Sequence, residues 1–236
     1  MKVIILCGGV GSRLAEETKL IPKPMVKIGN KPILSHIMTI YKHYGFKEFI
    51  LATGYKSSII ENYYKKNKNI KCIYTGKNTL TGGRLLRLKK YFSPNENFML
   101  TYGDGLTNQN LKKLLKFHLN HKKVATMTAV KPPARFGELL LNQSRVSKFE
   151  EKAQLKDNWI NGGFFVLNYK IFNFISGDKI MLEREPLSKL VKIKQLMAYR
   201  HKNFWQCMDT MRDKNILQKM WIKKNAPWIK LKKSKD

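Results

Sequence analysis

The chain has 236 residues, 43% of them hydrophobic, which is enough to bury one substantial core. No stretch approaches the roughly 18 consecutive apolar residues of a membrane span, and we expect no signal peptide because the first apolar run is short and passes directly into glycines and Arg13. The net charge of +30 would suit a polyanion, but the basic residues are spread along the chain rather than gathered in one block. We attribute the charge mainly to composition and expect no nucleic-acid or membrane partner, with a basic nucleic-acid-binding protein as the alternative from a different class.

The first half of the chain alternates between strand and helix patterns, which is typical of βαβ units and a largely parallel sheet. The predicted strands are residues 3–6, 48–53, 70–75, 98–102 and 124–130. The predicted helices are residues 32–44, 56–66, 84–92 and 110–121, the third of them opened by Thr81-Gly82-Gly83. Because residues 3–6 are all apolar, we expect that strand to be buried on both faces of the sheet.

Beyond Pro132-Pro133 the pattern becomes mixed. Shorter strands are predicted near residues 139–141, 146–150, 162–167 and 196–200, and helices near 169–175, 186–193 and 210–223. We find no internal repeat and no linker. The sequence therefore predicts a single α/β domain with a mostly parallel, partly mixed sheet flanked by helices.

A glycine-rich turn, Gly8-Gly9-Val10-Gly11-Ser12-Arg13, follows the first strand, and Pro22-Lys23-Pro24 follows nine residues later. Glycine lets a backbone approach a phosphate closely, and Arg13 adds a permanently charged fork. The loop lacks the Gly-Lys-Ser/Thr of a P-loop and the spacing of the dinucleotide fingerprint. An ordinary strand-to-helix turn is the alternative, but two prolines around Lys23 are an unusual setting for a merely solvated lysine. We interpret the two segments together as a phosphate clamp.

Two carboxylates are expected at the same edge of the sheet. Asp104 lies between two glycines directly after the strand at 98–102, and Asp209 follows a short aromatic segment and precedes the last helix. Carboxylates are hard oxygen ligands for Mg²⁺, which would also bind phosphate oxygens. Local sequence is equally consistent with Asp104 as a turn residue and with Asp209 or Thr210 as a helix N-cap.

A further group of residues suits a sugar phosphate. Glu151 and Asn161 offer directional hydrogen bonds to hydroxyls, Lys152 offers a charge for a phosphate, and Gly137 and Gly162 would let a flat ring approach the backbone. Surface charge at a hairpin explains the carboxylate and the lysine equally well.

The cysteines and histidines form no metal-ligand or nucleophilic arrangement. The three cysteines are widely separated and suit ordinary thiols in a reducing cytoplasm: Cys7, Cys72 and Cys207. The histidines are interpreted as structural or solvated: His36, His43, His118, His121 and His201.

In the order of these motifs, the chain resembles the sugar-1-phosphate nucleotidyltransferases over nearly its whole length. The resemblance is strongest to the members that use CTP and glucose 1-phosphate. The segments that carry the resemblance are 8–14, 22–25, 29–36, 81–85, 101–105, 135–137, 151–152, 161–165 and 204–212. The resemblance implies a Rossmann-like, nucleotide-diphospho-sugar transferase fold, with a nucleotide-binding half at 1–130 and a sugar-binding half at 131–236.

Residue roles follow from the same resemblance. Nucleotide binding is expected at Leu6, Gly8, Gly9, Gly11, Ser12, Arg13, Lys23, Thr81, Gly83, Arg84, Tyr102 and Gly103. Sugar-phosphate binding is expected at Gly137, Glu151, Lys152, Asn161 and Gly162, and Mg²⁺ binding at Asp104 and Asp209. The expected catalytic residues are Arg13, Lys23, Asp104 and Lys152.

The implied reaction is attack of α-D-glucose 1-phosphate on the α-phosphorus of CTP, giving CDP-glucose and pyrophosphate. Arg84 suits a cytosine reader because it only donates, and cytosine offers adjacent acceptors at O2 and N3. The family has a longer segment before Thr81 than the five residues 76–80 found here, and Ser12 replaces its usual threonine. The same chemistry with another nucleotide or sugar 1-phosphate therefore remains the nearest alternative, and a homo-oligomer is plausible.

Overall fold

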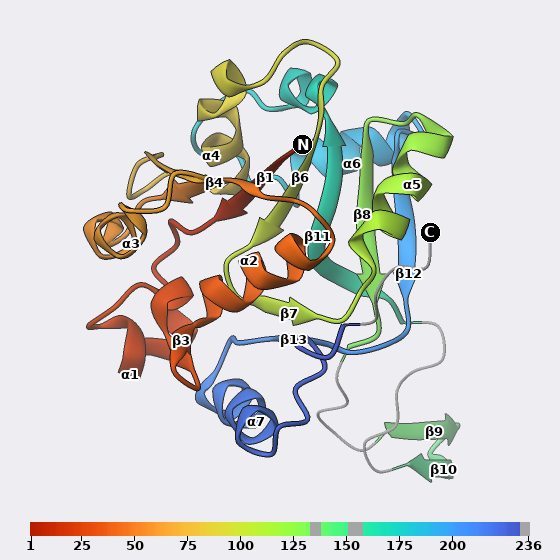
Figure 1. Cartoon of the computed structure of the whole chain (residues 1–236). Helices are drawn as coiled ribbons and strands as arrows, with labels where there is room; N and C mark the ends of the chain where they lie inside the picture. Colours follow the sequence, from red (N-terminus) through yellow and green to blue (C-terminus); the bar gives the residue numbers. More distant parts are fainter. Residues whose placement is uncertain (133–137, 151–157, 232–236) are drawn as a thin grey trace.

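The computed structural model describes residues 1–132, 138–150 and 158–231, with only the backbone at 138–141 and 148–150. Its centre is a seven-stranded sheet in the order β12-β8-β11-β6-β1-β4-β5, shown in Figure 1. The strands are β1 (Lys2–Leu6), β4 (Glu48–Thr53), β5 (Ile70–Tyr74), β6 (Asn97–Tyr102), β8 (Ala125–Val130), β11 (Ile160–Asn168) and β12 (Leu196–His201). β11 runs antiparallel to β6 and β8, and the other neighbouring pairs are parallel. The predicted α/β fold with a mostly parallel, mixed sheet is confirmed.

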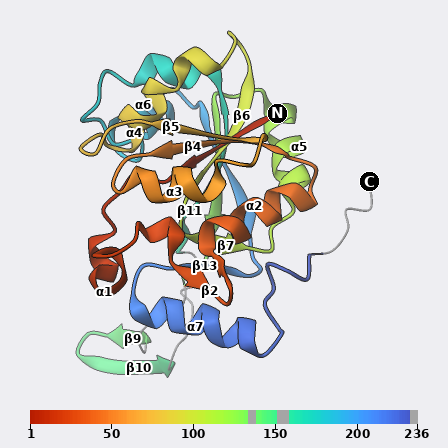
Figure 2. The same ribbon diagram turned by 60° about the vertical axis from the view of Figure 1, so that its left-hand side comes forward.

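Helices cover both faces of this sheet, as Figure 2 shows. They are α1 (Ala15–Thr18), α2 (Ile33–His43), α3 (Ser57–Tyr64), α4 (Thr81–Arg87), α5 (Leu111–His121), α6 (Glu185–Lys192) and α7 (Met211–Ile222). The 3-10 helices are η1 (Ser12–Leu14), η2 (Lys23–Met25), η3 (Lys89–Tyr91) and η4 (Tyr169–Phe174). Residues of α2, α3, α5 and α7 share one core cluster, and residues of α4, η4 and α6 share the other.

Strand β1 lies between these two cores. Val3 and Ile5 belong to the cluster that includes α2, whereas Ile4 and Leu6 belong to the cluster that includes α4. All four side chains are buried. Successive side chains of a strand point to opposite faces, so an unbroken apolar run is what a central strand requires. The prediction of a strand buried on both faces is confirmed, and it puts the glycine-rich turn at the carboxyl end of the central strand.

The structure corrects two helix predictions. The helix predicted at 84–92 begins at Thr81 as α4 and gives way to η3, and the helix predicted at 169–175 is the 3-10 helix η4. Glycine is a poor helix former, so the pattern alone did not include Gly82 and Gly83. A Cβ on Gly82 would lie 2.8 Å from the Ile180 carbonyl oxygen, and one on Gly83 would lie 2.4 Å from that of Asp178. Close packing against this backbone therefore requires glycine in the first turn of α4.

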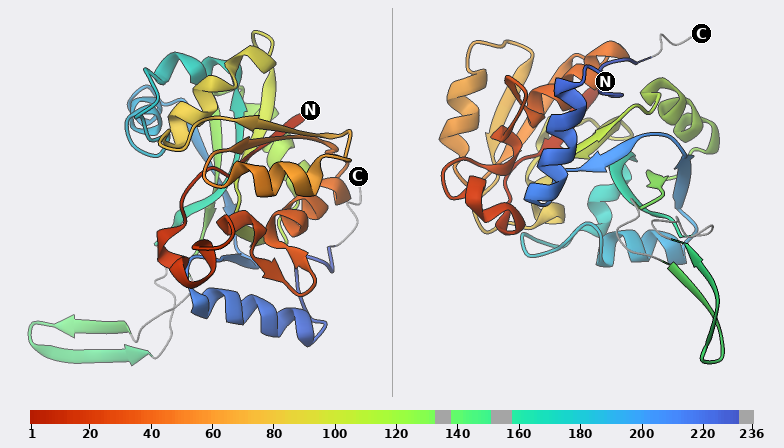
Figure 3. Two further views of the ribbon diagram at one scale, coloured as in Figure 1. Left: turned by 90° about the vertical axis from the view of Figure 1, so that its left-hand side faces the viewer. Right: turned by 90° about the horizontal axis from the view of Figure 1, so that it is seen from below.

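Three small two-stranded sheets complete the fold. They pair β2 (Lys27–Ile28) with β3 (Lys31–Pro32), β7 (Gly105–Thr107) with β13 (Trp205–Cys207), and β9 (Glu138–Asn142) with β10 (Arg145–Glu150). The predicted strands near 139–141 and 146–150 correspond to the β9–β10 hairpin, which lies apart from the central sheet in Figure 3. The short strands β7 and β13 were not predicted. Within the described residues, no helix has both the length and the apolar character to cross a bilayer.

Candidate active site

A pocket of about 450 Å³ opens at the carboxyl ends of the central strands. The turn after β1, the first turn of α4 and the end of β6 form its walls. Twelve of the residues predicted to bind substrates or metal line it: Leu6, Gly8, Gly9, Gly11, Arg13, Lys23, Thr81, Arg84, Tyr102, Gly103, Asp104 and Asn161. This edge of an open α/β sheet is where ligands bind in such folds.

The glycine-rich turn has a conformation that needs glycine. Gly11 has a φ of 71°, in the left-handed region, and a Cβ there would lie 3.0 Å from both the Lys23 Cβ and the Thr18 Cγ2. The Thr18 hydroxyl and the Leu14 N–H both donate to the Gly11 carbonyl. Gly9 faces open space, with no atom within 4 Å of the position a Cβ would take. The turn is therefore fixed at Gly11 and open at Gly9, where a ligand can approach the backbone.

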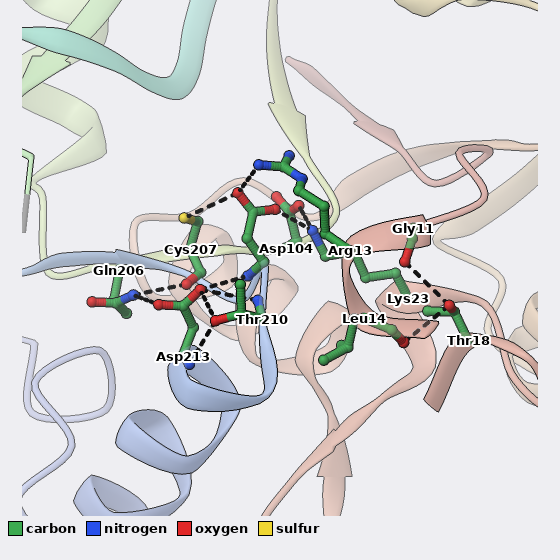
Figure 4. A network of polar contacts seen from close by, with 11 residues as sticks. Gly11, Arg13, Leu14, Thr18, Lys23, Asp104, Gln206, Cys207, Thr210 and Asp213 are labelled. Atoms are coloured by element: carbon green, nitrogen blue, oxygen red, sulfur yellow. Dashed lines mark hydrogen bonds and ion pairs between the residues drawn. The ribbon is translucent and has the colours of Figure 1, made fainter. Parts of the chain in front are cut away.

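Arg13, Lys23 and Asp104 line this pocket and form a charged cluster with Asp209, which is not part of the lining. Figure 4 shows Arg13, Lys23 and Asp104 side by side. The Lys23 Nζ lies 2.6 Å from an Asp104 oxygen and 2.5 Å from an Asp209 oxygen. The Arg13 Nη1 lies 2.9 Å from the other oxygen of Asp209. Lys23 is buried, whereas the Arg13 side chain is 73% exposed. Residues predicted from three distant segments thus form one cluster of alternating charge.

The pairing of β7 with β13 brings the two carboxylates together. Gly105 stands opposite Cys207 in this antiparallel pair, and the Met208 N–H donates to the Asp104 carbonyl at 2.9 Å. Asp104 therefore occupies the turn before β7, and Asp209 lies two residues beyond the last pair of β13. Asp104 is thus a turn residue. It also lies close to Asp209, because both carboxylates contact the Lys23 ammonium.

Helix α7 holds Asp209 in place through a capping box. Thr210 is the N-cap of α7, and its side chain accepts a hydrogen bond from the Asp213 N–H. One carboxylate oxygen of Asp213 accepts from the backbone N–H groups of Asp209 and Thr210 at 3.2 and 3.0 Å. The other oxygen accepts from the Gln206 side chain at 3.1 Å. Thr210, rather than Asp209, is thus the cap, which leaves the Asp209 carboxylate for Lys23 and Arg13.

The charges in this cluster stabilise one another. Burial works against the charged form of Lys23, but the attraction of Asp104 and Asp209 outweighs it and raises the pKa of Lys23. Burial likewise opposes ionisation of Asp209, but hydrogen bonding and charge from Lys23, followed by Arg13, lower the pKa of that carboxyl. Both groups are charged across the neutral pH range.

The donor set fits a magnesium ion that is shared with a substrate. The Lys23 ammonium already shows that Asp104 and Asp209 can hold one cation between them. In the part of the chain that the structure describes, no three His, Cys, Asp or Glu side chains form a metal-binding group. Mg²⁺ commonly uses one or two carboxylates, with waters and substrate phosphates completing its coordination. Two aspartates beside a phosphate clamp are therefore a suitable partial site for Mg²⁺.

Other predicted residues lie outside this pocket or outside the described residues. Ser12 is exposed and absent from the lining, Gly83 packs against the backbone of Asp178, and Gly162 packs against Val130 on β8. Gly137, Glu151 and Lys152 lie outside the described residues.

Glu183 lies in the pocket wall and was not predicted from the sequence. Its carboxylate accepts hydrogen bonds from the Tyr102 and Thr81 hydroxyls, each at 2.5 Å. The Asn161 amide in turn donates to the Tyr102 oxygen at 3.2 Å. This network joins the end of β6, the start of α4 and the start of β11. Glu183 lies in a charged segment just before α6, and no local pattern distinguished it from a surface carboxylate.

Arg84, the residue predicted to read the base, lines the pocket and is hydrogen-bonded to the protein itself. Its guanidinium is buried and donates to oxygens of the protein itself, including the Gly8 carbonyl at 2.8 Å and the Gly76 carbonyl at 2.6 Å.

The family model described as nucleotidyl transferase matches residues 2–221. The chain belongs to the nucleotidyl transferase family. It is 43% identical to a glucose-1-phosphate cytidylyltransferase of Salmonella typhimurium, over 97% of this chain and 98% of that protein. It is 41% identical to a probable glucose-1-phosphate cytidylyltransferase of Bacillus subtilis, over 97% of this chain and 99% of that protein.

A solved structure has a similar fold. The crystal structure of HddC from Yersinia pseudotuberculosis complexed with GMP-PN is similar with a TM-score of 0.74 and 26% identity, covering 93% of this chain and 99% of that one. Twelve of the residues named from the resemblance line one pocket of this family member. The chain is thus a nucleotidyltransferase whose predicted phosphate clamp and carboxylates share a site.

Proposed function

We propose that this protein transfers a cytidylyl group from CTP to α-D-glucose 1-phosphate and releases pyrophosphate. The observation that carries the proposal is the meeting of Arg13, Lys23, Asp104 and Asp209 beside the glycine-rich turn. Cations and backbone donors suit the polyphosphate of a nucleotide, and carboxylates suit the ion that accompanies it. The choice of CTP and glucose 1-phosphate is supported by two relatives at 43% and 41% identity over nearly their whole length.

In this mechanism an oxygen of the sugar 1-phosphate attacks the α-phosphorus of CTP in line with the leaving group. A new phosphorus–oxygen bond forms, the bond between the α-phosphorus and its bridging oxygen breaks, and the electron pair leaves with pyrophosphate. No general base is needed because the attacking phosphate is already ionised at neutral pH. Catalysis then consists of positioning the two anions and neutralising their charge.

The residues of the pocket divide this work. The turn at Gly8–Gly11 would cradle the triphosphate, exposed Arg13 would reach its outer oxygens, and Lys23 would neutralise charge close to the reacting phosphorus. Asp104 and Asp209 would hold Mg²⁺, which would supply charge neutralisation for the phosphate oxygens.

On the sugar side, we propose that Asn161, a pocket-lining residue of β11, contacts the sugar. We propose the same side for Gly137, Glu151 and Lys152, with Lys152 pairing with the sugar phosphate. These roles rest on the family resemblance.

A pyrophosphate-release assay that crosses CTP, UTP, dTTP and GTP with several sugar 1-phosphates tests the proposal. We expect the highest kcat/KM for CTP with α-D-glucose 1-phosphate. Faster pyrophosphate release with UTP or dTTP would overturn the nucleotide assignment, and faster release with another sugar 1-phosphate would overturn the sugar assignment.

Asp104→Asn tests the metal site. The amide keeps the size of the side chain but removes the negative charge, so we expect Mg²⁺-dependent turnover to fall by at least about 100-fold. The circular dichroism spectrum should be unchanged. Glu48→Gln, at the amino end of β4 on the opposite edge of the sheet, is the matched control and should keep full activity. Retained activity in Asp104→Asn would remove Asp104 from the metal site.

Three broader properties belong to the same proposal. We propose a single domain, because strands from both predicted halves share the central sheet. A cytoplasmic location is supported by three free cysteines. A homo-oligomer is supported by the family resemblance, and light scattering of the purified protein would test it.

A further inference from the structure

Arg84 is buried where three parallel strands end. Its side chain rises from α4, and the residue is 4% exposed. Its two terminal nitrogens donate to the carbonyl oxygens of Gly8 (2.8 Å), Thr53 (3.2 Å), Gly76 (2.6 Å) and Lys77 (3.3 Å) and to the Thr75 hydroxyl (2.9 Å). These acceptors lie at the ends of β1, β4 and β5. Two terminal nitrogens carry four N–H groups, so the protein itself occupies the donors that a base reader would need.

The backbone is shaped around this guanidinium. A Cβ on Gly8 would lie 2.0 Å from the Arg84 Nη1, and a Cβ on Gly54 would lie 2.4 Å from the same atom. That Cβ on Gly54 would also lie 2.8 Å from the Gly8 carbonyl oxygen. Any side chain at these two positions would displace the guanidinium or the strand ends. The two glycines are therefore matched to Arg84.

The Gly8 carbonyl is held from two directions. It accepts from the Arg84 Nη2 at 2.8 Å and from the Tyr55 N–H at 3.0 Å. The peptide unit is planar and trans, so fixing this carbonyl also fixes the N–H of Gly9, which points the opposite way. Gly9 is exposed at the pocket, with open space around its Cα. Arg84 and Tyr55 together thus fix the orientation of this peptide, with its N–H on the side away from them.

The positive charge of Arg84 also favours an anion at the glycine-rich turn. Burial lowers the pKa of the guanidinium, but an arginine stays protonated in a protein. None of its five hydrogen-bond acceptors is a carboxylate. A permanent positive charge therefore lies directly behind the glycine-rich turn, where the low polarity of the protein interior strengthens its attraction for an anion.

We propose that Arg84 is a positioning residue for the phosphate-binding turn: it fixes the Gly8–Gly9 peptide and supplies a buried positive charge, and it does not read the base. The inference rests on the proposed binding of a nucleoside triphosphate in this pocket. It predicts that Arg84 matters equally for every nucleotide and also for a polyphosphate that has no base.

Arg84→Lys tests this directly, because lysine keeps the charge but cannot hold the same set of oxygens. Binding of inorganic tripolyphosphate with Mg²⁺ is measured by calorimetry, and kcat/KM is measured with CTP and with UTP. We expect tripolyphosphate affinity to fall at least about tenfold, with the CTP-to-UTP preference unchanged within about twofold. Arg87→Lys, one turn along α4 and paired with exposed Asp178, is the matched control and should bind tripolyphosphate like the wild type.

Two results would overturn the proposal. One is unchanged affinity for tripolyphosphate, which would make Arg84 irrelevant to the turn. The other is a selective loss of activity with CTP relative to UTP, which would make Arg84 a base reader. A wild-type enzyme that prefers UTP would contradict the proposed nucleotide but not this proposal, because the test compares each variant with the wild type.

Thr75→Val provides a second test if Arg84→Lys does not fold. The Thr75 hydroxyl accepts from Arg84 and lies outside the pocket lining, so it cannot contact a base. Valine has nearly the same shape but removes this acceptor. We expect tripolyphosphate affinity to fall about threefold without a change in nucleotide preference. Unchanged affinity, or a changed preference, would count against the role of Arg84.

Discussion

At the scale of single residues, Lys23 is the most constrained cation in the site. Pro22 and Pro24 flank it, η2 begins at it, and its ammonium bridges Asp104 and Asp209. Without a bound ion, this ammonium neutralises the two carboxylates. A divalent cation that approaches the same oxygens must compete with a positive charge already in place. Metal binding should therefore depend on whether nucleotide phosphates are present to pair with the lysine.

Lys23→Met makes this competition measurable. Without the ammonium, Asp104 loses the cation it shares with Asp209 and only Arg13 still pairs with Asp209, so we expect the affinity for Mn²⁺ alone to rise by at least about tenfold. Electron paramagnetic resonance of free Mn²⁺ measures that affinity without substrates. Turnover should fall sharply at the same time, because the triphosphate loses a cation. Lys27→Met, an exposed lysine on β2, is the control. Equal or weaker Mn²⁺ binding by Lys23→Met would contradict the prediction.

At the scale of elements, an irregularity in β11 aims side chains into the pocket. The pairing of β11 with β8 shifts register between Asn161 and Phe165, and Gly163 within it has a φ of 75°. The side-chain oxygen of Asn161 accepts a hydrogen bond from the Gly163 N–H at 2.8 Å. The side-chain nitrogen of Asn161 donates to the Tyr102 hydroxyl oxygen. Bulges of this kind re-aim side chains beside active sites.

Gly163→Ala should disturb this element. A Cβ there would lie 2.5 Å from the Tyr102 ring, and its left-handed φ strains any residue other than glycine. We expect the free energy of unfolding in urea to fall by about 1–3 kcal/mol. Gly177→Ala is the matched control, because no atom lies within 4 Å of the added methyl. Equal stability of the two variants would show that β11 tolerates a side chain at position 163.

At the scale of the whole molecule, buried histidines link stability to pH. His36, His118 and His201 are buried, and burial lowers the pKa of each ring. For His118 the pKa falls to about 4, with a further contribution from the charge of His121. The unfolded chain binds a proton at His118 near pH 6.5, whereas the folded chain does so only near pH 4. Stability is therefore lost as the pH falls from about 6.5 toward 4.

His118→Gln should make the protein less sensitive to acid. Glutamine has no proton to take up on unfolding, so the fall in unfolding free energy between pH 7 and pH 4 should shrink by up to about 3 kcal/mol. Urea denaturation at a series of pH values measures this slope, whatever the variant's stability at pH 7. An unchanged slope would show that His118 does not contribute.

Much of this protein was predictable from local patterns. The apolar run at residues 3–6 required a central strand, and the glycines after it required a turn at that strand's carboxyl end. Strand and helix alternation gave the α/β class. The order of the motifs also predicted Lys23, Asp104 and Asp209 as site residues. These predictions were possible because the spacing of apolar residues, the backbone freedom of glycine and the burial of a strand depend on a few neighbouring residues.

Only the tertiary structure decided what each candidate contacts. It joined Asp104 to Asp209 through β7 and β13, strands of three residues that are too short for any sequence period to reveal. It placed Glu183 beside Tyr102, and it brought the Arg84 guanidinium against the Gly8 carbonyl. The sequence by itself determined which residue types were present and which edge of the sheet would hold them. Their partners depend on contacts between residues far apart in the chain, which local patterns do not encode.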